Sequence, residues 1–122
     1  MVITLLGEPK STGNIYKSRV IGKFASVYMT NGGKALKEYY QWQAKSQWKN
    51  KVLDCDLAIG VKLYFGTKRR SDIDNFNKLL LDSLTGIVYK DDSQIQHIEI
   101  TKFYDKELPR IEITIVPYEK EI

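Results

Sequence analysis

The 122-residue chain has little of what stabilises secreted proteins or anchors membrane proteins. It contains one cysteine, Cys55, which excludes an internal disulfide and leaves no second cysteine to share a metal. Its first apolar run, Val2 to Leu6, is far too short for a signal peptide or a membrane span. We therefore expect a cytoplasmic protein without membrane contact, in which Cys55 is an inert residue at the start of a strand.

The chain also lacks Gly/Ser-rich or Pro-rich linkers, fixed-period repeats and low-complexity tracts. Its length is that of one ordinary domain, which buries roughly two thirds of the surface of its unfolded chain. We predict a single domain over residues 1–122.

Charge is unevenly distributed along the chain. Residues 1–70 hold thirteen Lys and Arg against four Asp and Glu, whereas the remainder holds six against eleven. A cationic first half beside an acidic second half suits a surface that binds a polyanion next to carboxylates that could hold cations. Charge alone is equally compatible with lysines that only keep a small protein in solution.

Periodicity and turn residues predict the order β, hairpin, α, β, α, β, β, an α+β domain with a mixed sheet and two main helices. The clearest pattern is Leu57 to Phe65, where apolar residues alternate as in a central strand. A helix from about Lys34 to Asn50, capped by Thr30 or Asn31, has an apolar residue every four positions. The other expected elements are strands Val2 to Leu6, Ile15 to Val20, Phe24 to Met29, Ile95 to Phe103 and Arg110 to Val116, and a short helix that Thr85 and Gly86 end.

The chemically richest stretch is Lys68 to Asp92, KRRSDIDNFNKLLLDSLTGIVYKDD. Asp72 and Asp74 are two residues apart, so on extended backbone their carboxylates point to the same side and can share a hard cation. Asp is also a common helix cap and turn residue, and either role would explain the pair without a metal.

Two further features favour a site. Lys78 follows Asp74 by one helical turn, so its ammonium can reach the same place, although it could instead pair with Asp82. Asp91 and Asp92 can supply a carboxylate from a separate element. Because adjacent residues usually point apart, we expect only one of them to enter; the alternative is a turn that caps the next element.

These residues resemble the RusA-type Holliday junction resolvases, small homodimeric endodeoxyribonucleases often found in phages and prophages. The resemblance rests on the basic run before Asp72-x-Asp74-Asn75, the lysine three residues after that asparagine, a leucine-rich helix ending Asp82-Ser83-Leu84, and Asp91-Asp92 followed by a strand. Length and element order also match, so the resemblance covers nearly the whole chain.

The resemblance implies phosphodiester hydrolysis assisted by Mg²⁺, with Mn²⁺ as a substitute, and no small-molecule cofactor. Asp72, Asp74 and Asp92 correspond to the metal ligands and Lys78 to the catalytic lysine, whereas His97, alone in a strand, is expected to be structural or exposed. The partners implied are a four-way DNA junction and a second copy of the chain, in a bacterial or phage-infected cell. The expected DNA-contacting residues are Asn14, Lys17, Arg19, Lys68, Arg69, Arg70 and Asn75.

The chain departs from the family at Ser71, where members often carry an arginine before the first aspartate, so Arg69 and Arg70 must supply the local positive charge. The choice of Asp92 over Asp91 rests on the resemblance. Two other functions fit the residues: a non-catalytic basic module that binds branched DNA, with carboxylates that only cap and turn, and a nuclease that acts on other branched forms.

Overall fold

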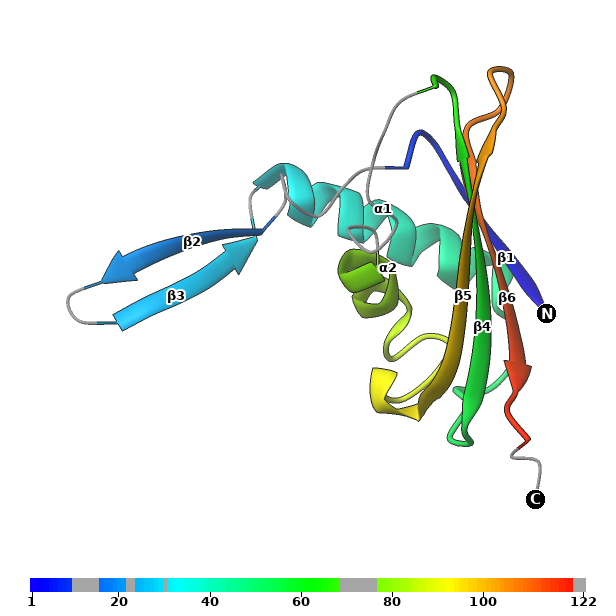
Figure 1. Ribbon diagram of the computed structural model, residues 1–122. Coiled ribbons are helices and arrows are strands. Elements are labelled where there is room, and N and C mark those ends of the chain that lie inside the picture. The colour runs from blue at the N-terminus through cyan, green and yellow to red at the C-terminus, as the bar shows by residue number, and fades with distance from the viewer. Residues whose placement is uncertain (10–15, 22–23, 30, 69–76, 120–122) are drawn as a thin grey trace.

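The computed structural model describes residues 1–9, 16–21, 24–29, 31–68 and 77–119, and Figure 1 shows their arrangement. The elements, in chain order, are β1 (Val2–Leu6), β2 (Tyr16–Ile21), β3 (Phe24–Met29), α1 (Asn31–Gln47), β4 (Leu57–Phe65), α2 (Asn77–Leu84), the 3₁₀ helix η3 (Asp92–Gln94), β5 (Ile95–Tyr104) and β6 (Arg110–Pro117). The predicted order of strands and helices is confirmed.

A mixed sheet with the strand order β1-β6-β4-β5 forms the body of the molecule. The alternation in β4 places Leu57, Ile59 and Val61 on the buried face, each at most 2% exposed, as the sequence predicts. Strand β4 lies inside the sheet, antiparallel to β6 and parallel to β5. Parallel neighbours cannot be joined by a tight turn, so the chain between β4 and β5 must cross back along the sheet.

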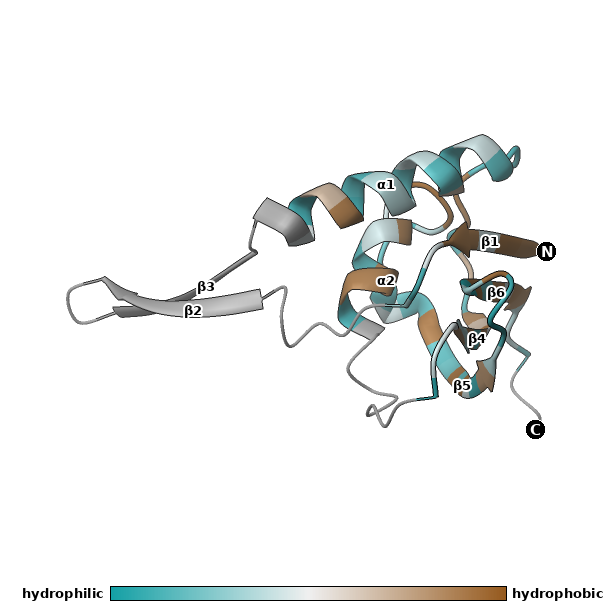
Figure 2. Cartoon of the chain, turned by 90° about the horizontal axis from the view of Figure 1, so that it is seen from above, coloured by the Kyte–Doolittle hydropathy of each residue, from teal (hydrophilic) through white to brown (hydrophobic). Residues whose placement is uncertain are grey.

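Both helices cover the same face of this sheet (Figure 1). In α1, the predicted stripe is confirmed, because Tyr40 and Ala44 belong to the buried core and Leu36 packs against it; Trp48, just after the helix, is buried as well. Figure 2 shows α1 coloured largely hydrophilic on its outer side and β1, β4 and β6 hydrophobic. The helices and the sheet therefore form one small α+β domain around a single apolar core.

Two glutamines of α1 bind the outer edge of β1. The Gln47 side chain accepts a hydrogen bond from Thr4 N at 2.8 Å and donates one to Thr4 O at 2.7 Å. Gln43 Oε1 accepts a hydrogen bond from Leu6 N at 2.9 Å. An edge strand exposes backbone groups that can pair with other chains, and these side chains satisfy them instead.

Strands β2 and β3 form a separate two-stranded antiparallel sheet, as the hairpin prediction requires. In Figure 1 this hairpin extends away from the four-stranded sheet, beyond the start of α1. The described helices include none that is both long enough and apolar enough to cross a membrane.

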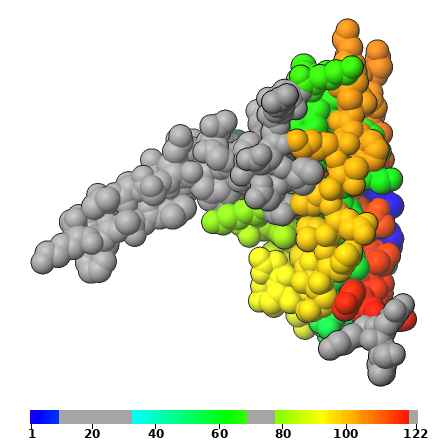
Figure 3. All heavy atoms as spheres, viewed as in Figure 1, coloured from blue at the N-terminus to red at the C-terminus, as the bar shows by residue number. Residues whose placement is uncertain are grey.

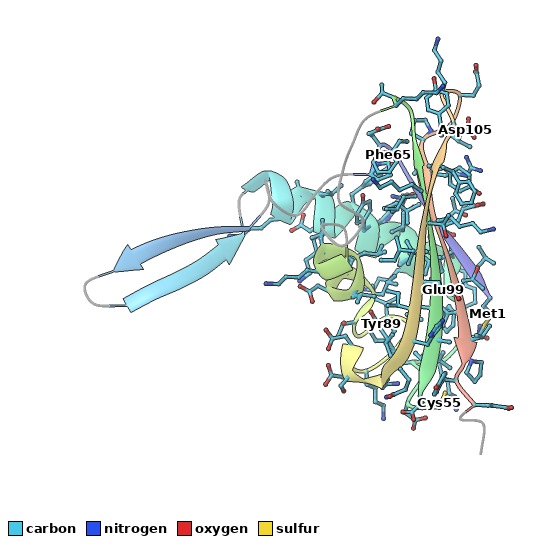
Figure 4. The ribbon with its side chains drawn as sticks, in the orientation of Figure 1. Met1, Cys55, Phe65, Tyr89, Glu99 and Asp105 are labelled. Atoms are coloured by element: carbon cyan, nitrogen blue, oxygen red, sulfur yellow. The ribbon has the colours of Figure 1, made fainter. Side chains whose placement is uncertain are left out.

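The segment that leaves β4 is held at Gly66. Gly66 N donates a hydrogen bond to Glu8 Oε2 at 2.8 Å, and Asp105 N donates one to Phe65 O at 2.8 Å. Gly7 N donates one to Pro109 O at 3.1 Å. The end of β4 is thereby attached both to the end of β1 and to the turn between β5 and β6, and Figure 4 shows Phe65 and Asp105 together at this end of the sheet.

This packing makes Gly66 sensitive to one added methyl group. A Cβ there would lie 2.8 Å from Pro109 Cγ and 3.0 Å from Glu8 Oε2. We expect Gly66→Ala to lower the free energy of unfolding by about 1–3 kcal/mol in urea titration, because the proline ring or the backbone must move. Gly60→Ala is the control, since its Cβ would meet only Thr114 Cβ at 3.9 Å. An equal loss in both variants would contradict the packing argument.

Candidate active site

Helix α2 carries two of the charged residues that the sequence singles out. Its apolar residues Leu79, Leu80 and Leu84 are at most 2% exposed and anchor it in the core. Lys78 is exposed in its first turn, and Asp82, one turn further, is partly exposed. Gly86 ends the segment with a φ of 85°, and the sequence predicts this helix end. The Gly86 N–H donates a hydrogen bond to Tyr89 O at 2.7 Å.

Tyr89 attaches the following turn to α2. Its side chain is fully buried, and its hydroxyl donates a hydrogen bond to Leu81 O at 2.6 Å. Burial is the main cause that raises the pKa of Tyr89 well above its usual value, so the hydroxyl remains a donor. Figure 4 shows Tyr89 on the helix-bearing side of the sheet, just before the Asp91-Asp92 pair in the chain.

Asp91 is the cap of η3. It has extended backbone angles, and its carboxylate accepts hydrogen bonds from Ser93 Oγ at 3.1 Å and Ser93 N at 3.5 Å. Gln94 Oε1 accepts the Asp91 N–H at 2.9 Å, which completes a capping box. The alternative that the sequence left open, a turn that caps the next element, is thus confirmed for Asp91.

Asp92, the neighbouring aspartate, is exposed and lies within the first turn of η3. A hydrogen bond with the Asp91 carboxyl is the main cause that raises the pKa of Asp92, and the charges of Asp91 and Asp82 raise it further. The same hydrogen bond is the main cause that lowers the pKa of Asp91. The chain is extended at Asp91 and begins to coil at Asp92.

Figure 3 shows η3 and the start of β5, in yellow, next to α2, in yellow-green, on one face of the molecule. Among the described residues, no group of three or more His, Cys, Asp or Glu side chains could hold a metal ion. A metal site that includes Asp92 would therefore need carboxylates from outside the described residues. Asp72 and Asp74 lie outside the described residues, as do Asn75, Arg69, Arg70 and Asn14.

The other sequence-predicted residues are dispersed. Lys68 is exposed, with Nζ 5.6 Å from the centre of the Tyr104 ring. Lys17 and Arg19 lie on β2, and their side chains are outside the described part of the chain. His97 is exposed, and its Nε2 lies 3.3 Å from Glu99 Oε1.

Sequence reasoning missed Gln94, whose side chain makes four hydrogen bonds around the Asp91-Asp92 turn. The signal was present: an aspartate followed three residues later by glutamine is the pattern of a capping box. The prediction allowed a capping turn at this pair but did not include Gln94 in it.

The fold and the acidic turn can now be compared with known proteins. The family model described as endodeoxyribonuclease RusA matches residues 7–116. The chain therefore belongs to the RusA endodeoxyribonuclease family, as its resemblance implies.

Two relatives are similar over different lengths. A Bacillus subtilis (strain 168) protein, called uncharacterized protein YqaN, is 28% identical over 92% of this chain and 92% of its own. The crossover junction endodeoxyribonuclease RusA of Aquifex aeolicus (strain VF5) is 28% identical over 64% of this chain and 63% of its own.

The different roles of the two aspartates predict opposite effects on stability. Asp91→Ala removes the cap and should lower the free energy of unfolding. Asp92→Asn should raise it at neutral pH, because the amide can still donate to Asp91 while the repulsion between two carboxylates disappears. The folded-state pKa of Asp92 is raised, so the gain from Asp92→Asn should vanish as pH falls below that pKa.

Urea titrations at pH 7 and in mild acid measure both effects. A loss of stability in Asp92→Asn at pH 7 as large as that in Asp91→Ala would contradict the assignment.

Proposed function

We propose that this protein is a Mg²⁺-dependent endodeoxyribonuclease that resolves four-way DNA junctions by paired phosphodiester hydrolysis. Membership of the RusA family and similarity to a crossover junction endodeoxyribonuclease support the reaction and the substrate. The structural observation that supports a role for particular residues is the turn at Asp91-Asp92. There one carboxylate is committed to a helix cap and the next is exposed beside it.

Asp72, Asp74 and Asp92 would hold the metal, since carboxylate oxygens are the ligands that Mg²⁺ and Mn²⁺ prefer. The Asp91-Asp92 pair fits a cation because the hydrogen bond between the two carboxyls and, to a lesser extent, the negative charge of Asp91 raise the pKa of Asp92, and a divalent ion would offset that charge. Asp74 precedes Asn77, at the start of α2, by three residues, which span at most about 11 Å. When bound, the metal supplies an activated water and neutralises charge on the scissile phosphate.

Lys78 would bind a phosphate oxygen and stabilise the charge that develops on it in the transition state. A lysine in the first turn of a helix opposes the helix dipole, which favours anions there. No acidic residue lies in the first turn of α2. The ammonium and the dipole would therefore attract the same phosphate group, which explains why a cation is placed at this end.

The basic first half would bind the DNA backbone, through Lys68, Arg69 and Arg70, which precede Asp72 in the chain, and through Lys17 and Arg19 on the hairpin. Exposed lysines on α1, including Lys34 and Lys45, and Lys49 just after the helix extend the positive charge. Such binding should weaken steeply with salt. A homodimer belongs to the same proposal, because a two-fold axis would place one site on each of two matching junction strands.

The decisive experiment compares cleavage of a mobile four-way junction, a flapped DNA and a linear duplex by wild type and Asp74→Asn. We expect Mg²⁺-dependent paired cuts in the junction only, abolished by Asp74→Asn while junction binding persists. Lys78→Met should lower the cleavage rate by about 10²–10³-fold. Sedimentation of the same protein with the junction should show a dimer.

His97→Ala is the matched control and should cleave normally, because His97 is exposed and belongs to no part of the proposed site. Full cleavage by Asp74→Asn would sink the site assignment. Salt-sensitive binding without cleavage at any metal concentration would favour the non-catalytic module, and preferential cutting of the flap would favour a different branched substrate. A monomer on the junction would contradict the dimer.

A further inference from the structure

The Gln94 side chain uses every hydrogen-bonding group it has. Its Oε1 accepts from Lys90 N and from Asp91 N, each at 2.9 Å. Its Nε2 donates to Leu53 O and to Cys55 O, again at 2.9 Å each. A side-chain amide offers two donors and one oxygen that accepts two bonds, so all four are satisfied.

These bonds join two segments that are far apart in sequence. Lys90 and Asp91 belong to the turn that leads into η3, whereas Leu53 and Cys55 lie between α1 and β4. The backbone connects the same segments, since Leu53 N donates to Val88 O at 2.8 Å and Lys90 N to Leu53 O at 3.2 Å. In Figure 4, Cys55 lies at the end of β4 opposite to Phe65, next to where β5 begins.

Asp92 lies between the two points that Gln94 fixes. Before Asp92, the Gln94 side chain accepts the N–H of Asp91. After Asp92, the chain reaches Gln94 itself two residues later. Asp92 is exposed, and its own backbone oxygen accepts a hydrogen bond from the N–H of Ile95, at the end of the same turn. Two of the hydrogen bonds that attach this turn to the Leu53–Cys55 backbone come from the Gln94 side chain.

We propose that Gln94 is a positioning residue that sets the place of Asp92 in the metal site by tethering its turn to the Leu53–Cys55 backbone. This inference rests on the proposed function, in which Asp92 is a metal ligand. Groups that orient a metal ligand without touching the metal commonly change metal affinity by about 10–100-fold when removed.

Glutamine suits this position better than its nearest replacements. Glutamate would keep both acceptor contacts to Lys90 N and Asp91 N but would place a carboxylate oxygen against two carbonyl oxygens. Methionine has similar length and would lose all four bonds. The pair of variants therefore separates the tether to residues 53–55 from the cap on η3.

The test uses two readouts on the full chain. In Gln94→Met, we expect the Mn²⁺ concentration for half-maximal junction cleavage to rise about tenfold, while junction binding in Ca²⁺ is unchanged. In the metal-free protein, amide hydrogen exchange at Asp91 should become faster, as measured by NMR, whereas Lys90 N keeps its hydrogen bond to Leu53 O. Gln94→Glu should raise the Mn²⁺ requirement as well, with the Asp91 amide still protected.

Gln96→Met is the matched control. Gln96 is exposed two residues further along and makes one long contact, Nε2 to Ser93 O at 3.4 Å. It should leave the Mn²⁺ requirement and the exchange rates unchanged.

Wild-type Mn²⁺ dependence in both Gln94 variants would overturn the inference, as would failure of both to fold, which would make Gln94 a residue of stability alone. If wild-type protein cuts no junction, the proposed function fails instead. The exchange measurement then still decides whether Gln94 holds the turn.

Discussion

The parallel pairing of β4 with β5 is the constraint on which the rest of the structure depends. The two strands run side by side over nine pairs of residues, so the chain that leaves β4 at Gly66 must return along the sheet before β5 begins at Ile95. Every residue of the stretch Lys68 to Asp92 lies in this crossover. The candidate chemistry is therefore built into the connection that the sheet topology requires.

Both ends of the crossover are held by side chains that bind backbone groups. At the start, Glu8 accepts the Gly66 N–H, and at the end Gln94 joins the Asp91 turn to the segment before β4. Between them, α2 is fixed in the core by leucines, and Tyr89 attaches the turn to α2. A connection that would otherwise be a surface loop is thus fixed at several points, which suits residues that must hold an ion and a phosphate.

The sequence predicted best what depends on the periodicity of single elements. The alternation in Leu57 to Phe65 identified a central strand and its buried face. Periodicity cannot name a strand's neighbour, so the parallel pairing with β5 was not predicted. Helix α1 begins at Asn31 rather than Lys34. It includes Gly32 and Gly33, although glycine disfavours helix. In the candidate site, spacing grouped Asp72, Asp74 and Lys78, and the family resemblance favoured Asp92 over Asp91. The structure adds that Asp91 is the cap of η3, which spacing could not show.

In the proposed function, Asp92, and not the capping Asp91, binds the catalytic metal. The most direct test is an anomalous difference map from crystals of the full chain grown with Mn²⁺. We predict a peak bonded to Asp92 together with Asp72 and Asp74, with Asp91 still bonded to Ser93. A Mn²⁺ ion bound by Asp91, or one held by Asp72 and Asp74 with Asp92 turned away, would contradict the assignment of Asp92 as a metal ligand.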